Sequence, residues 1–194
     1  MKKKWIMPGK LPPNAKMVFR GKIFEVWQWR QKLFDGSSAT FEKVRRPDTS
    51  LVVAIAGNKI LVLDERQPHQ KKVRVGLPGG RVDEGESPLR AAQRELLEET
   101  GYASGDWKLW MKQKPFFKIV WTIYTYIARD CKKIKMPNLE AGEKIRTKAI
   151  SFEEFLRLAG NRDFFEGRMK ELMLRARYNK KERKKLKELL FGGK

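Results

Sequence analysis

Residues 80–102 read GRVDEGESPLRAAQRELLEETGY, and this stretch predicts a glycine-bearing loop that runs directly into a helix. Ser87 is a favourable N-cap, and Pro88 follows at the first helical position, where proline is tolerated. Gly101 is placed to end the helix in a left-handed turn. Apolar residues recur near the helical period and give the helix one side for burial, namely Leu89, Ala92, Leu96 and Leu97.

Three carboxylates share another side of this predicted helix, because Glu95, Glu98 and Glu99 fall at i, i+3 and i+4. Like charges at that spacing destabilise a helix by roughly a few tenths of a kcal/mol per pair. A hard divalent cation would offset the repulsion, and Mg²⁺ is usually held by a few carboxylates, waters and substrate phosphates. Arg94, one turn before Glu98, can hold part of the cluster by a salt bridge. A solvated acidic face is the alternative interpretation of the three glutamates taken alone.

The full spacing of the stretch matches G-x5-E-x7-R-E-U-x-E-E-x-G-U, where U is an apolar residue. At an average usage of about 7% per residue type, a chance match to the fixed positions is on the order of 10⁻⁸ per starting point. The pattern resembles the Nudix box of the Nudix hydrolases. Tyr102 fills its last position, where an aliphatic residue is more usual. The fixed residues are Gly80, Glu86, Arg94, Glu95, Glu98, Glu99 and Gly101.

The resemblance implies an α+β protein with the Nudix fold, an α/β/α sandwich with a mixed sheet and an N-terminal β-hairpin extension. It also implies hydrolysis of a nucleoside diphosphate linked to another group, with Mg²⁺ (or Mn²⁺) as the cofactor. Bound metal would neutralise the diphosphate oxygens, lower the pKa of a water and align that water for in-line attack on phosphorus.

The family's site residues carry over onto matching positions of this chain. Glu98 and Arg94 join the catalytic set, with Arg94 as the partner that fixes the carboxylates, while Gly80 and Glu86 support them. The implied metal ligands are the backbone carbonyl of Gly79 and the side chains of Glu95, Glu98 and Glu99.

A loop after the box resembles the one that supplies a further glutamate, either to the metals or as the general base. Glu143, directly before Lys-Ile-Arg, is the better match, and Glu140 is the reserve. An ordinary loop acid is the alternative interpretation of either residue.

The segment before the box resembles the ADP-ribose and ADP-sugar pyrophosphatase branch of the family. It offers a strand, an Asp35-Gly36 turn, a second strand ending in FEKVRRPD at 41–48, and then an apolar strand. In that branch the N-terminal strands pair across a homodimer, an aromatic side chain stacks on adenine, and an arginine contacts phosphate or ribose. The alternative interpretation of the aromatic residues is packing within the hairpin or the dimer. The alternative interpretation of the arginines is a solvated strand end. The matching substrate-binding candidates are Phe24, Trp27 or Trp29, and Arg45 or Arg46.

Periodicity predicts the remaining elements. Ser151 and Glu154 form a capping box that opens a helix through about residue 158. A last helix is predicted over 168–190, with a solvated, partly helical extension as the default and amphipathic docking onto the core as the alternative. Strands are predicted over 18–29, 39–46, 51–56, 59–64, 116–129 and 145–150.

These elements suggest three segments. Residues 1–48 form an N-terminal arm and β-hairpin for dimerisation or substrate contact. Residues 49–165 form the Nudix hydrolase core, and residues 166–194 form a basic C-terminal helix.

Composition favours one core-forming domain in a reducing compartment. Of the 194 residues, 41% are hydrophobic, which is enough for a core. The single cysteine, Cys131, excludes an internal disulfide framework and fits the cytoplasm. The basic start at Met1 is followed by Pro8 without an apolar segment, so no signal peptide is expected. No run reaches transmembrane length, so no membrane partner is expected.

The formal net charge is +21, and the residues from Arg168 onward contribute +8 of it. This charge would attract anionic substrates and could bind nucleic acid through the basic C-terminal helix. The sequence therefore predicts Mg²⁺-dependent hydrolysis of ADP-ribose or an ADP-sugar to AMP and a sugar phosphate. The alternative is an RNA 5′-end pyrophosphohydrolase, or a Nudix protein that binds nucleic acid through its basic surface.

Overall fold

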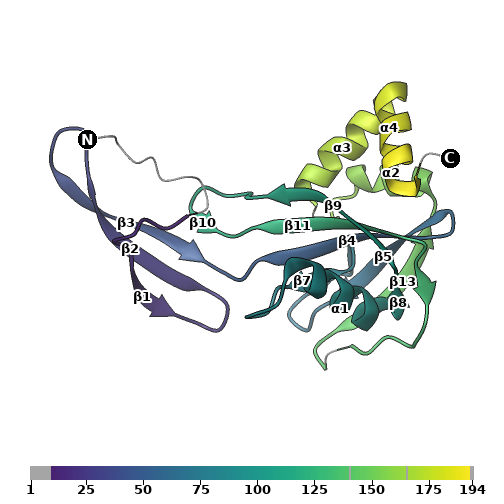
Figure 1. Ribbon diagram of the computed structural model, residues 1–194, viewed down its shortest axis with the longest axis horizontal. Coiled ribbons are helices and arrows are strands. Elements are labelled where there is room, and N and C mark those ends of the chain that lie inside the picture. Colours follow the sequence, from purple (N-terminus) through teal and green to yellow (C-terminus); the bar gives the residue numbers. More distant parts are fainter. Residues whose placement is uncertain (1–9, 140, 165, 193–194) are drawn as a thin grey trace.

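The computed structural model describes residues 10–139, 141–164 and 166–192, and it contains two main sheets that follow one another along the molecule (Figure 1). The strands are β1 (Lys16–Arg20), β2 (Glu25–Lys32), β3 (Ser38–Arg45), β4 (Thr49–Ala56), β5 (Lys59–Arg66), β6 (Arg74–Gly76), β7 (Gly79–Arg81), β8 (Tyr102–Ala103), β9 (Asp106–Gln113), β10 (Ile119–Val120), β11 (Ile123–Arg129), β12 (Lys132–Lys133) and β13 (Lys144–Ile150). The helices are α1 (Pro88–Thr100), α2 (Phe152–Arg157), the 3₁₀ turn η1 (Leu158–Gly160), α3 (Gly167–Tyr178) and α4 (Lys180–Phe191).

The N-terminal sheet has the strand order β1-β2-β3-β10. The central sheet has the order β13-β5-β4-β11-β9, with β6 beside β5 and β7 beside β4. β11 runs parallel to β4, whereas β5 and β7 run antiparallel to it, so the central sheet is mixed.

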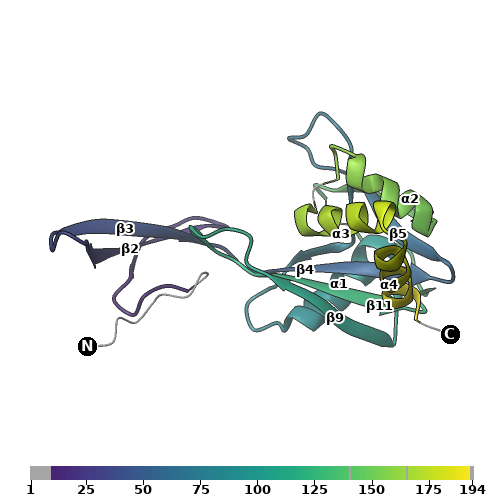
Figure 2. The same cartoon turned by 90° about the horizontal axis from the view of Figure 1, so that it is seen from above.

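Helices cover both faces of the central sheet, with α1 on one face and α2, α3 and α4 on the other (Figure 1 and Figure 2). β4 sends alternate side chains to the two faces, as a strand must. Val52 packs in the cluster that contains Leu96 of α1, and Val53 packs in the cluster formed with α2, α3 and α4. The predicted α/β/α sandwich with a mixed sheet is confirmed.

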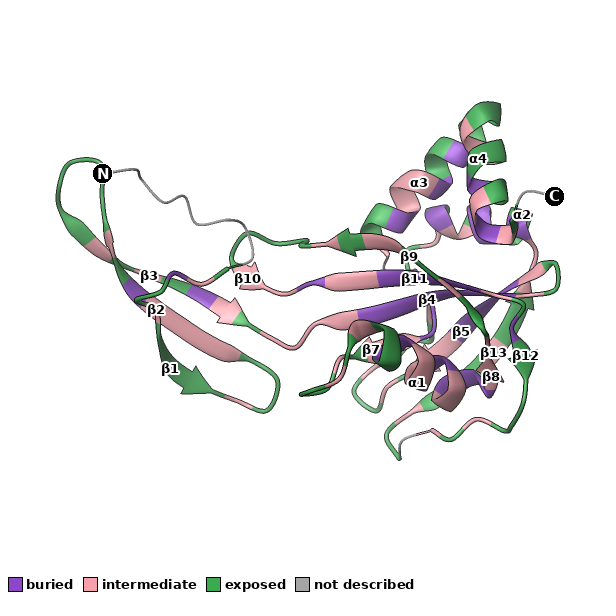
Figure 3. Cartoon of the chain, in the orientation of Figure 1, coloured by how far each residue is buried: buried purple, intermediate pink, exposed green. Residues whose placement is uncertain are grey.

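Burial follows the same division (Figure 3). β4 is almost entirely buried and β5 is buried at its four apolar residues, whereas β1 is exposed along its whole length and β3 is buried only at Lys43. The hydrophobic core therefore lies in the central sandwich, and the N-terminal sheet extends from it with little core of its own.

The prediction of one helix over 168–190 is wrong, because the C-terminal segment forms two helices, α3 and α4. α3 ends and α4 begins at Asn179, whose backbone is extended at φ −128° and ψ 113°. The Asn179 side-chain oxygen accepts hydrogen bonds from the N–H groups of Lys181 and Glu182 at 2.9 and 3.1 Å. Asparagine bonds to nearby backbone more readily than it continues a helix, and here it caps the start of α4.

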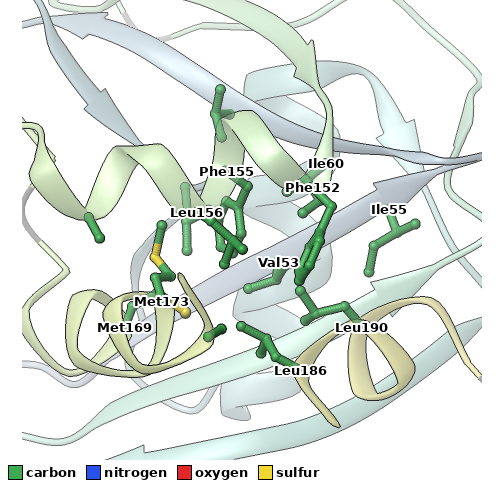
Figure 4. Packing of buried hydrophobic residues seen from close by; sticks show 14 of the residues in the cluster. Val53, Ile55, Ile60, Phe152, Phe155, Leu156, Met169, Met173, Leu186 and Leu190 are labelled. Atoms are coloured by element: carbon green, nitrogen blue, oxygen red, sulfur yellow. The ribbon is translucent and has the colours of Figure 1, made fainter. Parts of the chain in front are cut away.

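The same segment is not a solvated extension, because both helices bury their apolar sides against the sheet (Figure 4). Met173 and Leu190 are completely buried, and each such side chain contributes about 1.5–3 kcal/mol. Arg129 on β11 donates to the carbonyls of Leu189 and Leu190 at 2.7 and 3.0 Å. It thereby satisfies two carbonyls that the end of a helix leaves without partners. The alternative prediction, that this segment docks onto the core by its apolar side, is confirmed.

The N-terminal sheet keeps the predicted hairpin but divides the first predicted strand. Gly36 has φ 91°, and the Asp35 carboxylate accepts from the N–H of Ser37 at 2.9 Å, so β2 turns into β3 where expected. The single strand predicted over 18–29 is wrong, because the chain turns between β1 and β2. In that turn the N–H of Gly21 donates to the carbonyl of Phe24 at 2.8 Å.

Two segments of chain cross from the N-terminal sheet to the central sheet, at residues 46–48 and 121–122, and we call this crossing the neck. The N–H of Thr122 donates to the Asp48 carboxylate at 2.7 Å, and the N–H of Thr49 donates to the Thr122 carbonyl at 2.9 Å. Because the chain changes sheets here, the single strand predicted over 116–129 is two strands, β10 and β11.

Across the described ranges, no helix combines the length and the apolar character needed to cross a bilayer. The first nine residues of the predicted arm lie outside those ranges. The segment boundaries at 48/49 and 165/166 stay predictions, although α3 and α4 share one hydrophobic cluster with the central sheet.

Candidate active site

The helix that carries the acidic residues begins and ends as its sequence predicts. The Ser87 hydroxyl accepts from the N–H of Arg90 at 3.3 Å, and Pro88 occupies the first helical position. Gly101 ends the helix at φ 74°, and its N–H donates to the Leu97 carbonyl at 2.9 Å. A Cβ at Gly101 would stand 2.0 Å from the Lys135 carbonyl oxygen, so only glycine fits there.

Two glycines bring the backbone of β7 against the same helix. A Cβ at Gly79 would lie 2.2 Å from the Ser50 carbonyl oxygen, and a Cβ at Gly80 would lie 2.3 Å from the Glu95 carboxylate. Any larger residue at Gly80 would therefore displace Glu95. The box glycine thus keeps open the space that the carboxylate occupies.

Arg94 joins the acidic side chains into one network. Its Nε and Nη2 donate to the two oxygens of Glu86, both at 3.1 Å, and Nη2 also donates to the Arg81 carbonyl at 3.0 Å. Its Nη1 donates to Glu95 at 2.8 Å and to Glu98 at 3.1 Å. Hydrogen bonds from Arg94 lower the pKa of Glu86, and the bonds to Glu86 in turn raise the pKa of Arg94.

Glu99 is the most deeply buried of the box carboxylates and is 7% exposed. One of its oxygens accepts from the N–H of Gly79 at 2.7 Å. Burial raises the pKa of Glu99 to about 9, and burial also raises the pKa of Glu95 in spite of Arg94. A nearby cation would reverse both shifts, because it favours the charged form of each carboxylate.

The arrangement fits a hard cation in its chemistry, since the donors are carboxylate and carbonyl oxygens. Within the described residues, no three acidic, histidine or cysteine side chains already stand in a coordinating arrangement. Arg94 holds one oxygen of Glu95 and one of Glu98 in this geometry. A metal would therefore share these carboxylates with Arg94.

An open pocket of about 370 Å³ lies over this network. It is lined by every predicted catalytic and metal-binding residue other than the reserve Glu140, including Glu143 from the loop before β13. Glu143 is close enough to raise the pKa values of both Glu95 and Glu99. Glu86 supports the pocket through Arg94, and Glu140 lies outside the described residues. The lining residues are Glu65, Gln67, Gly79, Gly80, Arg81, Asp83, Arg94, Glu95, Glu98, Glu99, Asn138 and Glu143.

Several lining residues have no counterpart among the predicted site residues. Gln67 donates to the Glu65 carboxylate at 2.7 Å, and both residues stand at the end of β5. The backbone N–H of Asn138 donates to the Glu98 carbonyl at 2.8 Å, which holds the loop after β12 against α1. Arg81 and Asp83 flank the box loop and pair at 3.3 Å. The sequence gives one signal for Glu65 and Gln67. At the end of β5 the residues change from apolar to Asp64-Glu65-Arg66-Gln67.

None of the predicted substrate-binding aromatic residues is among the residues that line this pocket. Trp29 is 7% exposed and packs on Phe41, with ring centroids 6.1 Å apart, as the packing alternative describes. Trp27 donates from its indole N–H to Glu25 at 2.9 Å. Phe24 lies in the turn before β2, and the Arg46 guanidinium lies 5.9 Å from the centroid of its ring.

The two predicted arginines differ in position. Arg45 pairs with Glu25 at 3.6 Å within the N-terminal sheet. Arg46 lies at the neck, where its guanidinium sits 4.4 Å from the ring centroid of Trp121. Burial and the neighbouring Arg81 lower the pKa of Arg46. Of the two, Arg46 therefore stands nearer the pocket, next to a residue that lines it.

Comparison with known proteins agrees with this geometry. Residues 44–173 match the family described as the NUDIX domain. A methanol dehydrogenase activator of Bacillus methanolicus is 28% identical over 160 residues, which cover 80% of this chain and 85% of that protein. An ADP-ribose pyrophosphatase of Bacillus subtilis (strain 168) is 25% identical over 158 residues, covering 78% and 83% of the two chains.

Among solved structures, an ADP compounds hydrolase superposes with a TM-score of 0.69. The match covers 88% of this chain and 94% of that one, at 23% sequence identity. At this identity the likeness establishes the shared fold.

Proposed function

The chain belongs to the Nudix hydrolase family and is a pyrophosphatase, and from this we propose that it hydrolyses ADP-ribose or an ADP-sugar to AMP and a sugar phosphate. The observation that carries the proposal is the Arg94-centred set of carboxylates beneath the pocket, with Glu99 on the Gly79 N–H. The similarity to a protein named ADP-ribose pyrophosphatase supports ADP-ribose as the first substrate to test.

We propose Mg²⁺ (or Mn²⁺) as the cofactor, held by the Gly79 carbonyl and by Glu95, Glu98 and Glu99. When bound, such a metal neutralises diphosphate charge and lowers the pKa of a water. The support is the donor set itself, which consists of oxygens, and the raised pKa values of Glu95 and Glu99, which a cation would lower.

The protein's own groups position the reaction. Arg94 holds Glu95 and Glu98 in fixed orientations, so these carboxylates need no reorganisation when substrate arrives. Glu143 lines the same pocket, and we assign it the role of the base that accepts the proton of the attacking water.

Residues in and beside the pocket suit the two halves of an ADP-sugar. At the neck, Arg81 and Arg46 offer positive charge to the nucleotide phosphate, beside the exposed ring of Phe116 stacked on Trp121. The pocket is also lined by the carboxylate of Glu65 and the amides of Gln67 and Asn138, which can bind sugar hydroxyls.

This lining does not favour an RNA 5′-end as the reacting group. The cations among the described lining residues are Arg81 and Arg94, and Arg94 already serves three carboxylates. Bound metal would neutralise part of the charge of either substrate, so the shorter phosphate chain makes the smaller demand on the protein's own cations. This favours the sugar-linked diphosphate as the substrate class.

The test is a substrate panel with Mg²⁺, comprising ADP-ribose, ADP-glucose, dinucleoside polyphosphates, nucleoside triphosphates and 5′-triphosphate RNA. We expect the ADP-sugars to turn over fastest, and hydrolysis in ¹⁸O-water to show which phosphorus is attacked. Replacing Glu98 and Glu99 by Gln together should lower kcat by roughly 10³-fold or more. Full activity of the double variant would refute the assignment.

We further propose a homodimer that pairs through the N-terminal sheet, in a reducing, cytoplasmic setting. The support is the exposed apolar surface of β1 and the following turn, including Val18 (54% exposed) and Phe19 (58%). Light scattering should give twice the mass of the 22.8 kDa chain, and Val18→Asp with Phe19→Asp should give the monomer mass.

A further inference from the structure

The helix pair α3 and α4 presents a strongly basic outer surface. The two helices carry ten lysine and arginine residues and three glutamates. Their apolar sides are used in the core, where Met169, Met173, Ala176, Leu186 and Leu190 are buried. The charged residues consequently face outward, and we call this outer face the α3–α4 basic surface.

The lysines of α4 form two neighbouring rows. Lys180, Lys184 and Lys187 follow one another at i, i+4 and i+7, and Lys181 and Lys185 lie beside them at i and i+4. All five are exposed. This spacing places a ribbon of positive charge along one helix.

Acidic residues offset only part of this charge. Glu171 is shared by Arg168 and Arg175. Glu182 lies 3.5 Å from Lys185, and Glu188 lies 3.8 Å from Lys184.

No described carboxylate forms an ion pair with Lys180, Lys181 or Lys187. Three unpaired cations within about two turns of helix repel one another, and a bound polyanion would relieve that repulsion.

An aromatic side chain stands at the corner between the two helices. Tyr178 is 80% exposed, and the Arg177 guanidinium lies 5.7 Å from the centroid of its ring. Lys180 and Lys181 follow directly in the chain. Single-stranded nucleic acids are held by such combinations, in which bases stack on aromatic rings and lysines or arginines contact the phosphates.

The surface lies on the opposite side of the central sheet from α1, which forms the floor of the pocket (Figure 1 and Figure 2). The nucleotides bound there would therefore lie on the other side of the sheet from the carboxylates. An anionic membrane is the weaker partner, because a helix that inserts into a bilayer surface needs a free apolar side. The apolar sides of α3 and α4 are buried.

We propose that the α3–α4 basic surface binds single-stranded nucleic acid through its phosphates, with Tyr178 stacking on a base. Binding there is separate from hydrolysis in the pocket, so the protein can turn over its small substrate while it is held on a strand. The proposal does not depend on which nucleotide the pocket accepts.

The test is fluorescence anisotropy with labelled 20-nucleotide oligo-U RNA and oligo-dT DNA between 50 and 200 mM salt. The surface variant carries Lys180→Gln, Lys181→Gln, Lys184→Gln and Lys187→Gln. The control removes the same charge from four exposed lysines elsewhere, Lys108, Lys132, Lys133 and Lys135.

Each lost phosphate contact lowers the salt slope by about 0.7 for a single strand. We therefore expect the surface variant to bind roughly 10–100-fold more weakly at 50 mM salt, with a slope smaller by about two to three. The control should lose less than about threefold. Tyr178→Ala alone should weaken binding by roughly fivefold or more. Comparison of the RNA and DNA arms identifies the preferred strand.

Equal losses in the surface variant and in the control would overturn the proposal, since binding would then follow net charge alone. Tighter binding to phosphatidylserine vesicles than to either oligonucleotide, abolished in the surface variant, would also overturn it.

The two sites are separated by a second experiment. The Glu98→Gln, Glu99→Gln protein should bind the oligonucleotides as the parent does, and oligo-U should leave the KM for ADP-ribose unchanged. Competitive inhibition by oligo-U would place the strand in the pocket and overturn the proposal. If the parent hydrolyses no member of the panel, the binding experiment stands unaffected.

Discussion

Arg94 and Glu86, eight residues apart, meet through two parallel hydrogen bonds of 3.1 Å each. Such a two-pronged pair fixes the plane of the guanidinium as well as its position. The remaining nitrogen of Arg94 then faces Glu95 and Glu98. Glu86 therefore orients Glu95 and Glu98 indirectly, by fixing Arg94.

Replacing Arg94 by Lys should lower kcat/KM by about 10–100-fold and raise the Mg²⁺ concentration for half-maximal activity. A single ammonium group cannot reproduce the fork that serves Glu86, Glu95 and Glu98 together. Steady-state kinetics across a Mg²⁺ titration give both values. Arg90→Lys, an exposed change on the same helix, is the control, and equal behaviour of the two variants would refute the role given to Arg94.

Gly80→Ala should lower kcat/KM by about 100-fold while leaving the thermal midpoint nearly unchanged. The added Cβ would stand 2.3 Å from the Glu95 carboxylate and push it aside, and small misplacements of reacting groups carry costs of this order. Gly105→Ala is the matched control, because a Cβ there meets nothing within 4 Å. Wild-type kinetics in Gly80→Ala would show that Glu95 can move without loss.

Leu190→Ala should lower the free energy of unfolding by about 2–5 kcal/mol, as measured by urea denaturation. The side chain is completely buried between α4 and the sheet, so its removal leaves a cavity. Leu174→Ala, on the exposed side of α3 (39% exposed), should change stability by about 0.5 kcal/mol or less. A small effect at Leu190 would contradict the docking of α4.

Glu166→Gln should stabilise the protein at pH 8 by about 1–2 kcal/mol and leave it nearly unchanged at pH 4. Burial raises the pKa of the half-buried Glu166 carboxyl from 4.5 to about 7. Below pH 4.5 the carboxyl is protonated in both the folded and the unfolded protein, so its burial costs no ionisation energy. As the pH rises from 4.5 through about 7, the free energy of unfolding falls, because the unfolded protein ionises this group more readily than the folded one. Urea denaturation at several pH values measures the difference, with the exposed Glu84→Gln as the control.

Local signals predict the parts of this fold that short-range chemistry decides. Ser87, Pro88 and Gly101 bound α1 correctly, because capping and the left-handed turn depend on neighbouring backbone alone. The capping box of Ser151 and Glu154 is present for the same reason. Asn179 could also have been predicted as an N-cap, because asparagine is a preferred residue there. The apolar residues recur at the helical period on both sides of it, however, and so favoured one continuous helix.

Contacts distant in sequence decide the parts that prediction misses. The break at residues 121–122 depends on Asp48, more than seventy residues earlier, and β9 depends on its pairing with β11. Glu65 and Asn138 reach the pocket only because β5 and the loop after β12 pack beside α1. The box residues could be proposed from their own spacing, whereas their neighbours across the pocket could not.

The neck has a consequence for assembly through the N-terminal sheet. A domain on one flexible linker samples many orientations and must give them up on binding, which weakens association. Here two crossing segments are tied to each other by Thr122, Asp48 and Thr49. The N-terminal sheet would therefore meet the proposed second copy in an orientation that is already set, and little conformational entropy would be lost when that copy docks.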